Sequence, residues 1–90
     1  MDLTWDPAKA EANLKKHGVR FSDAETVLFD PLALSMEDSD AEGEDRYVAI
    51  GRDAIGRIMV VVYTYRGEQY RLISARNATP KEIRFYEKGI

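Results

Sequence analysis

Four segments of the chain carry the short apolar or alternating patterns that predict β-strands. The strongest is 58–66, which is β-branched almost throughout and is therefore expected at the centre of a sheet. Strands are also predicted at 46–52 and 70–76, and a weaker one at 32–36. A Gly-Glu turn lies between Arg66 and Gln69, just before the strand at 70–76, so 58–66 and 70–76 are expected to form a tight antiparallel hairpin.

A first helix is predicted near the N-terminus by the residues at its two ends. Asp6 suits the N-cap, Pro7 suits the first helical position, and Gly18 suits the left-handed position after the last turn. The basic residues at 15–17 favour the negative end of the helix dipole. The apolar stripe of this helix is thin, so packing rather than intrinsic propensity is expected to hold it.

Two more helices are predicted by the S/T-x-x-E pattern of a capping box. Ser22 and Glu25 mark the start of one helix, and Thr79 and Glu82 mark the start of the other. Residues 3–5 form a short apolar segment that is either an edge strand or a core anchor.

The order of these elements predicts a single domain of residues 1–90 with an α+β fold. Two N-terminal helices and a C-terminal helix are expected to pack on one face of an antiparallel β-sheet of about four strands. A chain of 90 residues has room for one hydrophobic core and not for two.

The composition excludes several classes of protein. There is no cysteine, so disulfides and thiolate metal sites are excluded, and a reducing cytoplasm is the expected compartment. The longest apolar run, 58–63, is far shorter than the ~18 residues of a membrane span, and the N-terminal segment lacks the apolar core of a secretion signal. We therefore expect a cytoplasmic protein with no membrane partner.

Charge is distributed unevenly along the chain, although the net value is only −3. Residues 30–45 hold seven acids and no base, whereas 46–90 hold nine bases and four acids. The basic C-terminal half therefore lies behind one acidic loop at 37–45, and local potential rather than the sum governs the binding of an anion. This loop is expected either to lie away from the ligand site or to face basic residues of a partner.

Arginines and tyrosines are interleaved in the last three predicted strands. Guanidinium groups bind phosphates in a bidentate manner and tyrosines stack on unpaired bases, so the pattern favours single-stranded RNA as a ligand. The residues concerned are Arg46, Arg66, Arg71, Arg76, Tyr63, Tyr65 and Tyr70. The alternative is that the arginines are solvated or pair with acids such as Glu44 and Glu82.

Strict alternation along 70–76 predicts which side chains share a face of the sheet. Leu72, Ser74 and Arg76 are expected on one face, and Arg71 with Ala75 on the other. Ser74 is interpreted as a packed serine of the strand. The register between strands is not known from the sequence, so arginines of different strands are not assigned to a common face.

His17 is the only histidine, and it ends the first predicted helix in the run K-K-H-G. It suits a hydrogen bond to a terminal carbonyl, and it also suits proton transfer because the ordinary pKa of histidine lies near neutrality. No second histidine or cysteine accompanies it and the acids show no EF-hand pattern, so no metal or other cofactor is expected.

Two motifs stand at opposite ends of the chain: W-D-x-x-K-x-x-x-N-x-x-K-H-G at 5–18 and I-S-A-R-x-A-T-x-x-E at 73–82. With them, nearly the whole chain resembles the BrnT family of type II toxins. The resemblance implies a RelE-like fold and a bacterial ribonuclease that inhibits translation. It also implies a BrnA-like ribbon-helix-helix antitoxin from an adjacent gene, and operator DNA bound only through that antitoxin.

Carried over residue by residue, the resemblance suggests candidates for the active site. The catalytic candidates are His17, Glu44, Arg46, Arg71, Arg76 and Tyr86. The candidates for RNA binding are Lys16, Arg66 and Tyr65.

The chemistry expected of such a site is RNA cleavage without a metal ion. A base removes the proton of the ribose 2′-OH, the oxygen attacks the adjacent phosphorus, and an acid protonates the leaving 5′-oxygen. The candidate bases are His17 and Glu44. Arginines stabilise the charge on the phosphate, and the candidate acids are Tyr86 and Lys16.

The alternative function is a non-catalytic protein, either a binding module or an inactive relative of the toxins. Such a protein docks the antitoxin and serves as a co-repressor, and it needs no general base. Cleavage of RNA in the absence of metal separates the two functions.

Overall fold

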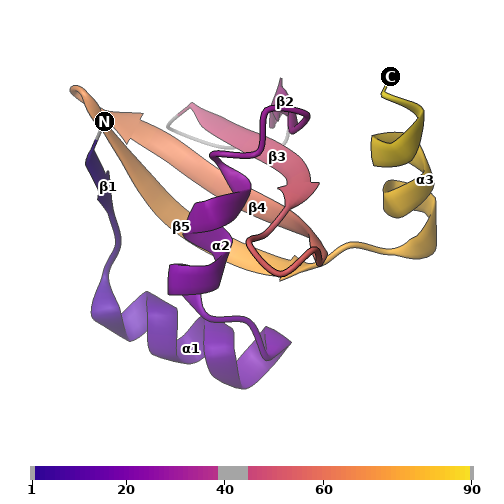
Figure 1. The fold of residues 1–90 in the computed structure, drawn as a ribbon. Helices are drawn as coiled ribbons and strands as arrows, with labels where there is room; N and C mark the ends of the chain where they lie inside the picture. The colour runs from indigo at the N-terminus through magenta and orange to yellow at the C-terminus, as the bar shows by residue number, and fades with distance from the viewer. Residues whose placement is uncertain (1, 39–44, 90) are drawn as a thin grey trace.

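The computed structural model describes residues 2–38 and 45–89. Within these residues the chain forms three helices and five strands, which confirms the predicted α+β class (Figure 1). Their order is β1 Asp2–Thr4, α1 Pro7–His17, α2 Phe21–Val27, β2 Leu34–Glu37, β3 Arg46–Arg52, β4 Ile58–Arg66, β5 Gln69–Asn77 and α3 Pro80–Lys88. None of these helices is long and apolar enough to span a lipid bilayer.

The described strands form one sheet in the order β1-β5-β4-β3-β2. Strands β2 to β5 are antiparallel neighbours, as predicted, with β4 at the centre. The prediction of about four strands, all antiparallel, needs one correction. A fifth strand, β1, pairs in parallel with β5 and makes the sheet mixed. A strand of three residues is too short to show alternation, so the sequence left 3–5 ambiguous.

Both ends of α1 and the start of α3 lie where their sequence signals predict. The Asp6 side chain accepts a hydrogen bond from the Ala8 N–H at 2.9 Å, and Gly18 follows α1 with φ of +70°. Thr79 and Glu82 form the predicted capping box at the start of α3. Left-handed backbone at Gly18 costs little because glycine has no Cβ.

The capping box predicted for α2 does not form. The helix begins at Phe21 with Arg20 as its N-cap, and no side chain caps it. Phe21 is buried at 2% exposure, with Trp5 packed edge-on against its ring. Burial of this aromatic side chain therefore sets the first turn, which leaves Ser22 inside the helix rather than at its cap.

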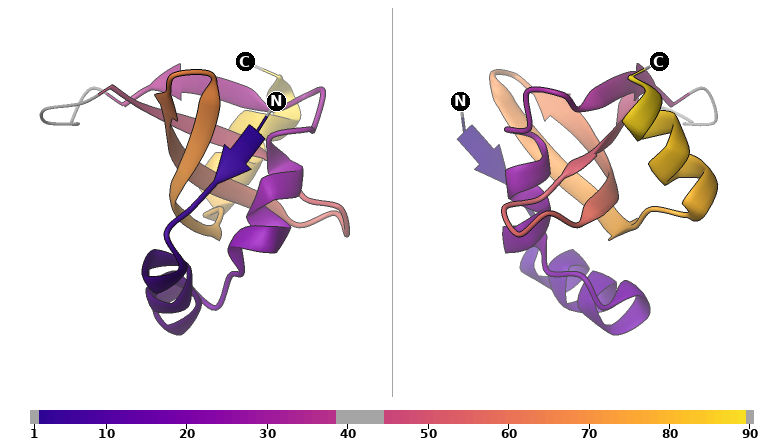
Figure 2. Two further views of the ribbon diagram at one scale, coloured as in Figure 1. Left: turned by 90° about the vertical axis from the view of Figure 1, so that its left-hand side faces the viewer. Right: turned by 45° about the vertical axis from the view of Figure 1, so that its right-hand side comes forward.

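Helices cover both faces of the sheet, which corrects the prediction of a single covered face. The larger core joins α2 to β3, β4 and β5 and contains Phe21, Val27 and Leu72. On the opposite face, Tyr86 of α3 packs against Ile50 and Val60. Figure 2 shows α2 and α3 on opposite sides of the strands. Because β4 is apolar on both faces, each face can hold a helix.

A β-bulge in β5 changes which residues share a face. Val62 of β4 pairs with Ser74, and the next residue, Tyr63, pairs with Leu72, so Ile73 is an extra residue in β5. Leu72 and Ala75 consequently both enter the larger core, although strict alternation would separate them. The predicted grouping of Leu72 with Ser74 and Arg76 is therefore wrong.

Candidate active site

The bulge brings Arg71, Ser74 and Arg76 to one face of the sheet, the face that α3 covers in part. Arg71 pairs with Thr64 of β4, and Thr64 pairs with Arg46 of β3. Residues opposite one another on neighbouring strands point to the same face. Arg46 and Arg71 therefore share this face from two different strands.

The other two arginines belong to the same face. Arg76 pairs with Val60, which lies in the core under α3. Arg66 follows Thr64 by two positions on β4, so it also projects to that side. The register thus brings together, on one face, the four arginines that the sequence could not assign. Arg46 and Arg71 are half-buried, whereas Arg66 is exposed.

The tyrosines form a cluster on the opposite face. Tyr47, Tyr63, Tyr65 and Tyr70 contact one another with ring centroids 4.7 to 5.9 Å apart. Tyr65 donates a hydrogen bond to the Tyr70 hydroxyl at 3.2 Å, and this bond together with burial raises the pKa of Tyr65. The strand alternation that interleaves tyrosines with arginines in sequence therefore separates them in space. Tyr65 and Arg66 do not belong to one continuous surface.

Arg76 and Glu82 form a bidentate ion pair. Arg76 Nη1 lies 2.7 Å from Glu82 Oε1, and Nη2 lies 2.9 Å from Oε2. The hydrogen bond from Arg76 is the main reason why the pKa of Glu82 falls to about 2. The interpretation that an arginine pairs with an acid therefore holds for Arg76.

Arg71 differs from Arg76, because within residues 2–38 and 45–89 no hydrogen bond or ion pair engages its guanidinium. Glu44 lies outside the described residues.

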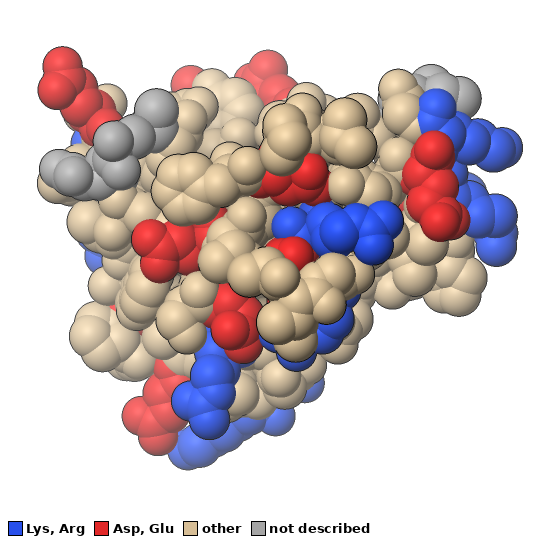
Figure 3. Space-filling view, viewed as in Figure 1, with Lys and Arg blue, Asp and Glu red and all other residues tan. Residues whose placement is uncertain are grey.

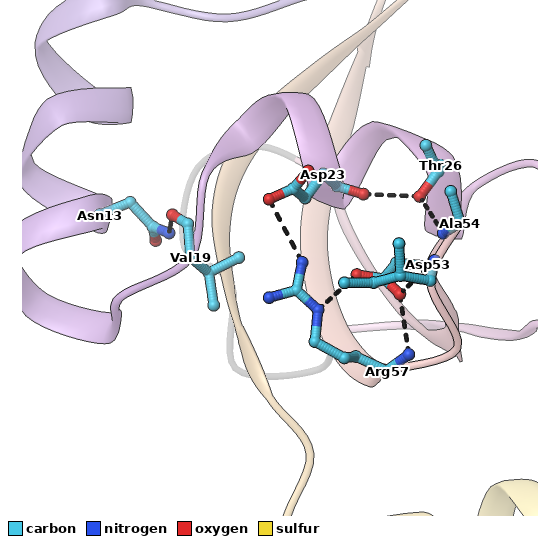
Figure 4. Close-up of polar contacts among 8 residues, drawn as sticks. Asn13, Val19, Asp23, Thr26, Asp53, Ala54 and Arg57 are labelled. Atoms are coloured by element: carbon cyan, nitrogen blue, oxygen red, sulfur yellow. Dashed lines mark hydrogen bonds and ion pairs between the residues drawn. The ribbon is translucent and has the colours of Figure 1, made fainter.

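Asn13 attaches α1 to the open edge of β5. Its Nδ2 donates to the carbonyl oxygens of Ala75 at 2.9 Å and Val19 at 3.0 Å, and its Oδ1 accepts from the Ala75 N–H at 3.0 Å. Figure 4 shows the bond to Val19. Because β1 pairs with β5 only as far as Arg71, the edge beyond it needs other hydrogen-bond partners. The Asn13 amide meets that need at Ala75 in the way a neighbouring strand would.

A shallow groove of about 250 Å³ lies between α1 and β5. Its lining residues are Lys9, Ala12, Asn13, Lys16, His17, Ile73 and Ser74. The groove brings the basic end of α1 beside Ser74, the residue that lies between Arg71 and Arg76 on β5. His17 and Lys16, both named from the sequence, therefore meet the arginine-bearing strand here.

Sequence reasoning missed three residues of this groove: Lys9, Asn13 and Ser74. Lys9 and Asn13 occupy fixed positions of the motif at 5–18, and Ser74 belongs to the motif at 73–82. Membership in these motifs was therefore the sequence signal that could have identified the three residues. The motifs could not show that Asn13 forms hydrogen bonds to a residue 62 positions away in the chain.

Tyr86 lies outside the groove, on the inner side of α3. Its side chain is buried, and its hydroxyl donates to Asp30 Oδ2 at 2.6 Å. This hydrogen bond and burial raise the pKa of Tyr86. Burial alone would raise the pKa of Asp30, but hydrogen bonds from Tyr86 and from the Arg52 and Leu32 N–H groups lower it overall.

A second network fixes the β3–β4 turn against α2 (Figure 4). The buried Asp53 carboxylate accepts hydrogen bonds from the Ile55 and Arg57 N–H groups and from Arg57 Nε. Arg57 Nη2 also lies 3.2 Å from Asp23 on α2. Each charged group is paired, so this network serves the turn. Among the described residues no cluster of His, Asp or Glu is arranged to hold a metal ion.

Comparisons with known proteins agree with these observations. A family model described as "Ribonuclease toxin, BrnT, of type II toxin-antitoxin system" matches residues 5–82. The crystal structure of the Brucella abortus ribonuclease toxin BrnT is 30% identical, with a TM-score of 0.69 over 88% of this chain and 97% of that chain. A search of curated proteins found no match. The chain therefore belongs to the BrnT family of ribonuclease toxins of type II toxin–antitoxin systems.

Proposed function

We propose that this ribonuclease toxin cleaves RNA without a metal ion in the groove between α1 and β5. The observation that carries the proposal is the groove itself, where His17 and Lys16 lie beside Ser74 on the strand that bears Arg71. A titratable imidazole, an ammonium group and an unpaired guanidinium are the groups that phosphodiester cleavage through the 2′-hydroxyl needs.

The reaction assigns one role to each of these side chains. The neutral imidazole of His17 takes the proton of the ribose 2′-OH as the oxygen bonds to phosphorus. The bond from phosphorus to the 5′-oxygen breaks, and Lys16 gives that oxygen a proton. Arg71 contacts the phosphate oxygens on which negative charge increases. The products carry a 2′,3′-cyclic phosphate and a free 5′-hydroxyl.

The remaining sequence candidates take other roles in this proposal. Arg46 and Arg66 attract the RNA to the arginine-bearing face, and Arg76 holds α3 to β5 through Glu82. Tyr86 supports α3 through Asp30 rather than donating a proton. Tyr65 offers a partly exposed ring on the opposite face, where it can contact RNA beyond the cleaved bond.

The cognate antitoxin, in this proposal, is a BrnA-like ribbon-helix-helix protein that neutralises the toxin and carries the complex to operator DNA. The toxin's net charge of −3 supports DNA binding by the antitoxin rather than by the toxin, because a protein that binds DNA directly gains most of its affinity from an excess of cations. The toxin itself acts on RNA in the cytoplasm and so inhibits translation.

Incubation of the purified toxin with RNA in EDTA tests the proposal. We expect cleavage with cyclic-phosphate ends, lost on His17→Gln and reduced at least tenfold by Lys16→Gln. Lys15→Gln is the matched control, because Lys15 is its neighbour on α1 but does not line the groove and is paired with Glu11 at 3.2 Å. A requirement for added Mg²⁺, or equal losses for the two lysine variants, would refute the assignment.

A further inference from the structure

Three cations line the exposed side of α3. Lys81, Arg84 and Lys88 are exposed and occupy positions i, i+3 and i+7, so they project from one side of the helix. Within residues 2–38 and 45–89 no ion pair engages any of them. Together with Phe85 they line a shallow depression of about 390 Å³, which we call the α3 basic surface. Figure 3 shows Lys and Arg side chains over α3, with an acidic side chain beside them.

The acids of α3 leave this surface positive. The Glu82 carboxylate accepts hydrogen bonds from Arg76 and from the Thr79 N–H. Its negative charge is therefore compensated by Arg76 at the start of the helix. Glu87, the other acid of α3, is exposed three residues after Arg84 and borders the surface, so three cations and one acid leave it a net charge of +2. A surplus of cations here contrasts with the net charge of −3 for the whole chain. Local potential at this surface therefore favours an anionic ligand.

The α3 basic surface lies on the helix that directly follows β5, the strand that carries Arg71 and Arg76. Helix α3 packs on the face that carries Arg71 and Arg76, with Tyr86 against Val60. The ion pair between Arg76 and Glu82 fixes the first turn of α3 directly after β5. Along α3 itself the three cations of the surface follow one another at a rise of about 4.5 to 6 Å along the helix axis.

We infer that the α3 basic surface is a second RNA-contact surface of this toxin, which holds single-stranded RNA beyond the segment that is cleaved. The inference rests on the ribonuclease function and deepens it. A row of cations that tracks a phosphate backbone beside an aromatic ring is the arrangement that binds single strands regardless of sequence. Phe85, at 38% exposure, offers that ring.

RNA fits this surface better than a protein does. A protein interface needs an apolar centre that excludes water. The α3 basic surface has one partly exposed apolar side chain, Phe85, among three charged ones. The depression is also shallow and open, so it holds a flexible polyanion more readily than an anchoring side chain.

Paired double variants test the inference. Arg84→Gln with Lys88→Gln removes two cations from the surface, and Lys15→Gln with Arg20→Gln removes one arginine and one lysine from exposed sites on the α1 and α2 side. Both doubles change the net charge equally. Affinity is measured for a single-stranded RNA with 2′-O-methyl riboses, which binds but cannot be cleaved, over a range of salt concentrations.

We expect the α3 double to weaken RNA binding about tenfold and to lower the slope of log affinity against log salt by about 1.4, because each lost phosphate contact contributes about 0.7. The control double should change neither. Equal effects of the two doubles, or loss of antitoxin binding with RNA binding intact, would overturn the inference. Because the ligand is not cleaved, this result is independent of whether His17 and Lys16 perform catalysis.

Discussion

Arg76 and Glu82 join the end of β5 to the first turn of α3 through two parallel contacts of 2.7 and 2.9 Å. The same carboxylate accepts the Thr79 N–H at 2.8 Å and completes the capping box. One side chain therefore both starts the helix and fixes its position relative to the strand. This ion pair, the Tyr86–Asp30 hydrogen bond and the packing of Tyr86 on Ile50 and Val60 together set the location of α3.

Glu82→Ala should lower the free energy of unfolding by about 1 to 2 kcal/mol, since it removes a cap and a partly exposed ion pair. The guanidinium side chain of Arg76 is 42% exposed, so solvent weakens the pair and keeps the loss in this range. Urea unfolding measures the change. Glu87→Ala, at an exposed position of the same helix, should change stability by less than about 0.5 kcal/mol. Equal losses for the two variants would contradict the structural role of Glu82.

The lowered pKa of Glu82 predicts how stability depends on pH. The hydrogen bond from Arg76 lowers this pKa from 4.5 to about 2 in the folded protein. A carboxyl whose pKa is lowered by folding contributes stability above its unfolded pKa, and this contribution is lost as the pH falls through the folded value. The stability advantage of the parent over Glu82→Gln should thus be constant above about pH 6 and shrink between about pH 5 and 2. An advantage that is as large at pH 2 as at pH 6 would refute the assignment.

The parts of the fold that the sequence predicted depend on local signals. Both ends of α1 follow from Asp6 and Gly18, and the start of α3 follows from the Thr79–Glu82 pair, because a cap needs only residues within one turn. The central position of β4 follows from its apolar residues on both faces. The basic end of α1 and the arginines were likewise visible as residue types.

What the sequence did not predict depends on contacts between distant segments. The bulge at Ile73 lets both Leu72 and Ala75 of β5 enter the larger core. Strict alternation would place these two side chains on opposite faces of the sheet. The parallel pairing of β1 depends on the path of the chain through both N-terminal helices. Asn13 looked like one polar residue in a thin apolar stripe, yet it supports the groove.

Asn13→Ala should destabilise the fold by about 2 to 4 kcal/mol, because the Ala75 N–H and two carbonyl oxygens lose their buried partner. RNA cleavage should fall at temperatures where the variant is still folded, since α1 loses its attachment to β5. The control is Asn77→Ala, an exposed asparagine at the end of the same strand. Thermal unfolding and cleavage rates are the measurements. Full cleavage by folded Asn13→Ala would show that the groove does not depend on this amide.

Asn13→Asp tests the hydrogen bonds that Asn13 donates, because the aspartate side chain has nearly the same shape as asparagine. The carboxylate can still accept from the Ala75 N–H but cannot donate to the carbonyls of Ala75 and Val19. Its stability should fall at least as far as that of Asn13→Ala at neutral pH, because a buried charge faces two carbonyl oxygens. Lowering the pH protonates the carboxyl and should recover part of the loss.

Tyr86→Phe decides whether this tyrosine donates a proton in catalysis or supports α3. The substitution keeps the ring that packs on Ile50 and Val60 and removes only the hydroxyl that bonds Asp30. Because a buried hydrogen bond to a charged group contributes about 1.5 to 3 kcal/mol, stability should fall by about that amount, while the cleavage rate of the folded protein should stay within about twofold. The opposite outcome, unchanged stability with cleavage lost, would assign the proton donor to Tyr86. Measuring urea unfolding and single-turnover cleavage on the same preparation distinguishes the two roles directly.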